Sequence, residues 1–144
     1  MATQVLGLRE LQQAMEQIPE RMQQNVLRSG NRAVANAIVK SVRNNTNLPA
    51  TVRKAIRAES DPSKRVTKGF MVGLRKPFSP LAHLIEFGSA PRRQKTTGRF
   101  TGRMPANPFL RPALDELGGG KAAEIWAKAA SRNFALQMRK LARQ

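Results

Sequence analysis

The sequence contains no cysteine and no tyrosine, and it has a single histidine. The absence of cysteine excludes disulfide bonds, thiolate metal sites and cysteine nucleophiles. A serine or threonine nucleophile needs an adjacent base that a third group holds in place, and only His83 is available as that base. We therefore expect a protein that is not an enzyme and that uses no metal and no cofactor.

His83 does have one potential chemical partner. It lies three residues before Glu86, so a helical turn would place the two on one face, as a base with its orienting group or as two metal ligands. A metal site needs three or four ligands, and the chain offers no second histidine. We therefore prefer a structural or interface role for the pair.

Long hydrophobic runs are also absent. No stretch approaches the roughly 20 apolar residues of a membrane-spanning helix. The first residues, MATQVLGLRE, lack the basic start and apolar core of a signal peptide. These features predict that the chain is made in the cytoplasm and has no membrane partner.

Acidic residues are scarce, with nine Asp and Glu against 26 Lys and Arg, which gives a formal net charge of +17. Thirteen of the basic residues and only three of the acidic ones fall within residues 51–103. Such an excess indicates polyanionic or acidic partners. The length predicts a single domain over residues 1–144, and its small core favours assembly into a homo-oligomer.

Apolar periodicity predicts helices at both ends of the chain and strands in the middle. Residues 8–18, 19–44 and those from about Lys121 show helical spacing, and shorter helices are expected at 81–87 and 109–117. The pattern from Thr51 fits a short helix or a strand, and we favour a helical turn followed by a strand to Ser60. A turn at 61–64 and partial alternation at Val66, Phe70, Val72 and Leu74 then predict a β-hairpin. The expected class is α+β, with long N-terminal helices, a small antiparallel sheet, a long basic loop and a C-terminal helix.

The loop is expected at residues 89–103, which contain no acidic residue and three glycine or proline residues. Its cations form the candidate binding site for DNA or a neighbouring subunit: Arg92, Arg93, Lys95, Arg99 and Arg103. Glycines would leave each arginine free to find its own partner, so we expect a mobile loop. DNA and an acidic protein are equally compatible with it, and the single aromatic Phe100 argues against single-strand stacking.

Two further motifs favour structural roles. Gly118-Gly119-Gly120-Lys121 resembles part of a phosphate-binding loop, but Ala122 stands where that motif requires serine or threonine. We therefore expect a helix break at the glycines. Trp126 has helical spacing with other apolar residues, which favours a core or subunit contact over a base-stacking platform.

One segment combines the sequence HLIEFGS at 83–89, the basic loop, and MPANPFLRPALD at 104–115. This order resembles that of the HK97-type neck and tail-completion proteins of tailed bacteriophages. The resemblance implies a long helix, a small sheet, a turn, a basic loop and a final helix, an order that covers nearly the whole chain. Ser89 stands where these proteins often have threonine, and Asn107 stands where arginine is common.

The resemblance also implies a function and a set of structural residues. The function would be that of a virion protein at the head–tail junction, made in the bacterial host cytoplasm. It would form a six-fold ring, or a multiple of one, that contacts the head connector or stopper, the tail terminator or tube, and DNA in the channel. The motif residues would shape the turn and the entry into the last helical part: Glu86, Phe87, Gly88, Pro105, Ala106, Pro108, Phe109 and Pro112.

Two other classes of function remain open. The net charge is compatible with a free, sequence-independent DNA-binding protein. A small basic ribonuclease of the toxin type is a third class, against which the lack of tyrosine and the single histidine argue.

Overall fold

The fold belongs to the α+β class, as the sequence predicts. The computed structural model describes residues 13, 19–45, 47–61 and 69–143. In this part of the chain, long helices come first and last along the sequence, and two small two-stranded sheets lie between them in chain order. Apart from residue 13, the helix expected at 8–18 lies outside the described residues.

The chain divides into two compact units. The first comprises Met1–Ala37, Ala58–Met71 and Leu117–Gln144, and the second comprises Ile38–Arg57 and Val72–Glu116. The predicted loop and both flanking motifs lie in the second unit.

Helix α2 spans Glu20–Asn44 and helix α6 spans Lys121–Leu141, close to the predicted bounds. Helix α6 and the larger part of helix α2, up to Ala37, belong to the first unit. Pro19 precedes α2, and its carbonyl accepts hydrogen bonds from the amides of Met22 and Gln23 at 2.8 and 3.2 Å. Proline suits this position because a helix start has no partner for its first amide groups.

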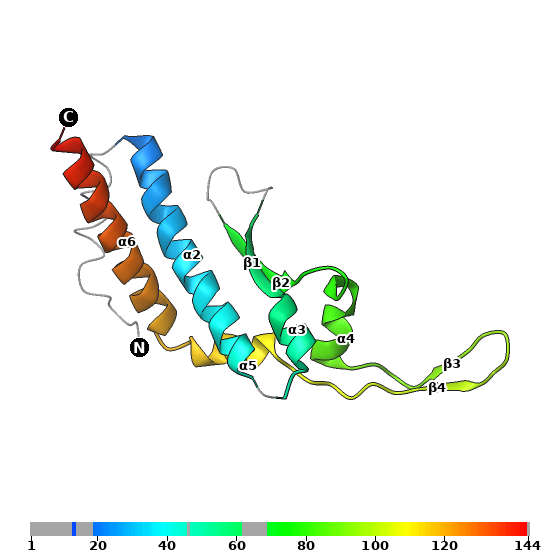
Figure 1. Cartoon of the computed structure of the whole chain (residues 1–144). Coiled ribbons are helices and arrows are strands. Elements are labelled where there is room, and N and C mark those ends of the chain that lie inside the picture. The colour runs from blue at the N-terminus through cyan, green and yellow to red at the C-terminus, as the bar shows by residue number, and fades with distance from the viewer. Residues whose placement is uncertain (1–12, 14–18, 46, 62–68, 144) are drawn as a thin grey trace. The chain divides into compact units, whose positions relative to one another are not determined.

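Helices α2 and α6 pack together through Trp126 in the first unit (Figure 1). The Trp126 Nε1 donates to Asn31 Oδ1 at 3.0 Å. A Cβ at Gly30 would lie 2.5 Å from the same nitrogen, so only glycine lets the indole approach α2 this closely. Trp126 therefore has a packing role, as its helical spacing indicates.

The first sheet is the predicted antiparallel hairpin. Helix α3 spans Ala50–Ala55 and continues directly into strand β1, Ile56–Ser60, which pairs with β2, Phe70–Leu74. Backbone hydrogen bonds of 2.9 Å close both ends of the pair, from Asp61 to Gly69 and from Arg75 to Ala55. The expected turn residues 62–64, and Val66 of the expected second strand, lie outside the described residues.

The remaining elements of the second unit are short. They are the 3-10 helix η1 at Ser79–Leu81, α4 at Ala82–Phe87, β3 at Arg92–Arg93, β4 at Phe100–Gly102 and α5 at Leu110–Glu116. The core of this unit is made of aliphatic side chains and one phenylalanine: Val39, Val42, Leu48, Val52, Ile56, Leu74, Ile85, Phe109 and Ala113. Phe109 is the largest of the fully buried side chains.

The triple glycine forms the predicted helix break before α6. Gly119 and Gly120 have φ angles of 63° and 99°, which are costly for residues with a Cβ. The Ala122 amide donates to the Leu117 carbonyl at 3.1 Å and so closes this turn. Among the described residues, no helix is long and apolar enough to span a membrane.

Candidate functional site

The Glu86 carboxylate connects the two motifs that flank the predicted loop. Glu86 lies in α4 and is 8% exposed. Its Oε2 accepts hydrogen bonds from the amides of Phe109 and Leu110 at 2.8 and 3.0 Å, and its Oε1 accepts one from Arg111 at 3.1 Å. One buried side chain therefore binds three consecutive amides more than twenty positions along the chain.

These hydrogen bonds account for the start of α5. The first four amides of a helix have no partner within the helix. At α5, Glu86 binds the amides of Phe109, Leu110 and Arg111, and the next residue is Pro112, which has no amide hydrogen. All four positions are thus accounted for, which gives Glu86 and Pro112 complementary roles in capping one helix.

The turn after α4 depends on Gly88. Gly88 has a φ angle of 73°, and its amide donates to the Leu84 carbonyl at 2.8 Å, which ends the helix. A Cβ at this position would lie 2.7 Å from the Ala106 nitrogen and 2.8 Å from the Met104 oxygen. The backbone of residues 104–106 therefore passes too close to Gly88 for any side chain.

Hydrogen bonds join the two flanks beside Gly88. The Ser89 amide donates to the Met104 carbonyl at 2.9 Å, and the Met104 amide donates to Ser89 Oγ at 3.1 Å. The Asn107 amide donates to the Ile85 carbonyl at 2.8 Å, and its Nδ2 donates to the Asn47 carbonyl at 3.0 Å. We call these two joined segments, residues 85–89 and 104–111, the brace.

Sequence reasoning missed the roles of Ser89 and Asn107. The sequence shows each of them only as a departure from the residue common in the neck proteins that it resembles. Short polar side chains often bond to nearby backbone groups, but the sequence does not show which distant carbonyl or amide they reach. The Ser89 hydroxyl contact is one that threonine could also make, and the Asn107 side chain reaches the Asn47 carbonyl through its Nδ2.

The other motif residues are exposed. Phe87 is 75% exposed at the end of α4, and Pro105, Ala106 and Pro108 are also exposed. Their side chains therefore add little to the core of the second unit. Phe87 offers a large apolar surface within the brace, of the kind that anchors protein interfaces.

Residues 89–103, which we call the basic arm, contain a short hairpin in place of the irregular loop that the sequence predicts. Strands β3 and β4 pair antiparallel, with Arg92 opposite Gly102 and Arg93 opposite Phe100. The Gln94 amide donates to the Arg99 carbonyl at 2.9 Å and so extends the pairing toward the tip. The hairpin extends away from α4 and α5 (Figure 1).

Backbone bonding explains this difference. The sequence prediction rests on the poor apolar content of the arm, which is indeed exposed along nearly all of its length. Hairpin hydrogen bonds need no buried side chains, and Gly98 supplies a positive φ of 65° at the turn. An exposed two-stranded hairpin is marginally stable by itself, so its shape depends on what it contacts.

All five predicted binding cations are exposed on the arm: Arg92, Arg93, Lys95, Arg99 and Arg103. Arg92 and Arg93 form β3, Lys95 and Arg99 lie between the two strands, and Arg103 directly follows β4. The arm contains no carboxylate to neutralise them. The structure thus brings these cations together on one exposed hairpin, and the brace holds both ends of that hairpin. This arrangement suits an anionic surface more than a small enclosed ligand.

The structure does not support chemistry at Glu86 and His83. Both Glu86 oxygens accept backbone amides, and His83 is exposed. Among the described residues, no group of three or more His, Asp or Glu side chains is placed to hold a metal ion.

Comparison with known proteins finds no match to the chain among family models, curated proteins or solved structures. The resemblance to neck proteins therefore depends on the motifs at 83–89 and 104–115.

The close contact at Gly88 leads to a prediction about stability. We expect Gly88→Ala to lower the free energy of unfolding by about 2 kcal/mol, because the added Cβ would meet backbone atoms and the positive φ is unfavourable. Gly98→Ala is the matched control, since Gly98 has a similar φ of 65° but nothing within 4 Å of its Cβ position. It should cost only about 1 kcal/mol. Urea denaturation measures both free energies of unfolding. Equal losses in the two variants would show that the contact with residues 104–106 is unimportant.

Proposed function

We propose that this chain is a structural, non-enzymatic assembly protein that presents a basic arm to an anionic neighbour. The observation that carries the proposal is the binding of Glu86 to three amides of the segment that follows the arm. This contact fixes both ends of the arm to the second unit. A fixed base lowers the entropy lost when an exposed segment binds its partner.

Within this class, we propose a particular place for the chain, at the head–tail junction of a tailed phage particle. There it acts as a neck or tail-completion protein and forms a ring of six-fold symmetry or a multiple of it. The ring contacts the head connector or stopper on one side and the tail terminator or tube on the other. The motifs at 83–89 and 104–115 support this placement, because the brace joins them and the arm lies between them.

Deletion of the gene tests this placement in its phage. We expect DNA-filled heads and complete tails that fail to join, with infectivity restored when the gene is supplied in trans. Electron micrographs of lysates give the readout. Joined, infectious particles made without the chain would refute the proposal.

A second candidate function is free, sequence-independent DNA binding. The observation in its favour is the net charge of +17 with five exposed cations on one hairpin. Each phosphate that a cation neutralises contributes about −0.9 to the slope of log K against log salt concentration. The two functions therefore predict different DNA binding by the isolated monomer.

Charge removal on the arm separates these two functions. If the monomer binds DNA freely, changing Arg92, Arg93 and Lys95 to alanine should make the salt slope shallower by roughly 3 units. The control changes three exposed cations at the end of α6 and just after it, Arg139, Lys140 and Arg143. We expect from the assembly role that the monomer binds duplex DNA only weakly, and that the arm variant blocks head–tail joining while the control does not. Fluorescence anisotropy at several salt concentrations gives the slopes.

A further inference from the structure

A second group of cations surrounds a hollow on the second unit, separate from the arm. The hollow has a volume of about 550 Å³ and is lined by Ala50 and four basic residues: Arg43, Arg53, Lys54 and Arg57. These residues come from the end of α2, from α3 and from the start of β1, which follow one another closely in the chain. We call it the basic hollow.

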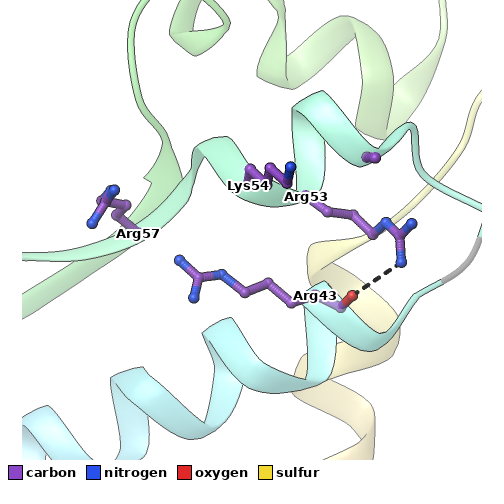
Figure 2. A pocket seen from close by; sticks show the side chains of 5 residues that line it. Arg43, Arg53, Lys54 and Arg57 are labelled. Atoms are coloured by element: carbon purple, nitrogen blue, oxygen red, sulfur yellow. Dashed lines mark hydrogen bonds between the residues drawn. The ribbon is translucent and has the colours of Figure 1, made fainter.

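Three guanidinium groups and one ammonium group share this space, and none of the residues that line it is acidic. Figure 2 shows Arg43 extending from the end of α2 along α3, Arg57 lying on β1, and Arg53 turning back toward the Arg43 carbonyl. Like charges held this close repel one another, and an anion between them would remove that repulsion.

Arg43 and Arg53 use only some of their hydrogen-bond donors. The Arg43 Nη2 donates to the Ile56 carbonyl at 2.9 Å, and the Arg53 Nη1 donates to the Arg43 carbonyl at 3.5 Å (Figure 2). The Arg53 Nε is buried and, within the described part of the chain, has no hydrogen-bond partner. A buried donor without an acceptor is unfavourable, so a rotation of the Arg53 side chain that brings this nitrogen to an anion would be favourable.

We propose that the basic hollow binds a phosphate group. Guanidinium groups present paired donors that match the oxygens of a phosphate, and several of them can surround one tetrahedral anion. A carboxylate has two oxygens and a single charge, so it would leave more of these donors and charges unmatched. The phosphate group can be a free ion or part of a nucleic acid backbone. This site does not depend on the proposed role in phage assembly.

Calorimetric titration of the full chain with inorganic phosphate tests the site, at an ionic strength held constant with chloride. We expect saturable binding with one phosphate per chain. The double variant Lys54→Gln/Arg57→Gln should weaken binding about tenfold or more, since each charged hydrogen bond is worth about a tenfold change in affinity. Both residues are exposed, and among the described residues neither has a hydrogen bond to the brace or the core.

The matched control is Arg32→Gln/Lys40→Gln, which removes the same charge from exposed positions on α2 that do not line the hollow. Its affinity for phosphate should stay within about twofold of the wild type. Equal weakening in both double variants, or titration without saturation, would overturn the proposal, because either result indicates a diffuse ion atmosphere.

A thermal melt without phosphate shows whether the double variant affects phosphate binding or the stability of the fold. Because the double variant relieves repulsion, it should melt at the wild-type temperature or above it, while losing the stabilisation that phosphate gives the wild type. A lower melting temperature without phosphate would overturn the proposal, because these cations would then stabilise the fold directly.

Arg53→Lys keeps the charge of Arg53 but removes its paired donors. It should also weaken phosphate binding about tenfold, because lysine cannot replace the guanidinium geometry. Unchanged affinity would show that charge alone attracts the anion and would overturn the proposed site.

A short DNA duplex distinguishes the two sources of phosphate. If the duplex competes with inorganic phosphate in the wild type, and the Lys54→Gln/Arg57→Gln variant weakens both, the site takes a backbone phosphate. If the duplex and inorganic phosphate bind independently, the site takes the free ion.

Discussion

Phe109→Ala is expected to lower the free energy of unfolding by about 3–5 kcal/mol, the usual cost of deleting a buried phenyl ring. Phe109 is 1% exposed and lies at the entry to α5, where its amide also binds Glu86. The substitution would both open a cavity in the core of the second unit and loosen the brace. Chemical denaturation followed by circular dichroism measures the loss.

The control for this prediction is Leu114→Ala, on the same helix. Leu114 is 54% exposed, so its truncation should cost less than about 1 kcal/mol. If Leu114→Ala were as damaging as Phe109→Ala, α5 would pack on the unit through a different face from the one described.

Glu86→Ala is expected to cost about 3–4 kcal/mol, since it leaves three amides at the start of α5 without their acceptor. Loss of a charged hydrogen bond costs about 1.5–3 kcal/mol for a buried donor and less for donors that water can reach. The Phe109 amide bond is buried, and those of Leu110 and Arg111 are partly buried. Urea denaturation gives the free energy, and hydrogen exchange at these three amides should accelerate.

Glu86→Gln gives a graded test of the same contact. One glutamine oxygen can accept the two amides that now bind Oε2, but its NH₂ group would face the Arg111 amide. We expect Glu86→Gln to lower the free energy of unfolding by about half as much as Glu86→Ala does. Asp115→Asn is the control, an exposed carboxylate on the same helix that should change stability by less than about 0.5 kcal/mol. A neutral effect of Glu86→Ala would contradict the proposed capping of α5.

Much of the fold could be predicted from local sequence patterns. Helical spacing located α2 and α6, and period-two alternation located the β1–β2 hairpin. Gly88 stops α4 at the expected residue because a positive φ is a local requirement that glycine meets. Each of these features depends on residues that are close together in the chain.

The contacts of the brace could not be predicted in the same way. Glu86 was recognised as a motif residue, but its partners lie 23–25 residues further along the chain, and no periodicity specifies that pairing. The arm was recognised by its charge, whereas its hairpin depends on backbone hydrogen bonds that composition does not show. Both the brace and the hairpin depend on hydrogen bonds between segments that are not adjacent in the sequence.

The basic hollow was missed for a related reason. Its cations lie within residues 43–57, where the sequence shows only part of a broad positive charge. The hollow exists because α3 turns back against the end of α2, as the Arg53 contact with the Arg43 carbonyl shows. Charge counts over a window cannot distinguish such a concave site from a solvated surface.

The central claim, that the chain is a head–tail junction protein whose basic arm binds an anionic neighbour, is tested most directly by a reconstruction of the mature phage particle. We expect a ring of this chain at the neck, with residues 89–103 against DNA or an acidic surface of an adjacent ring. Mature infectious particles that lack the chain would contradict it, as would a ring in which the arm points into solvent.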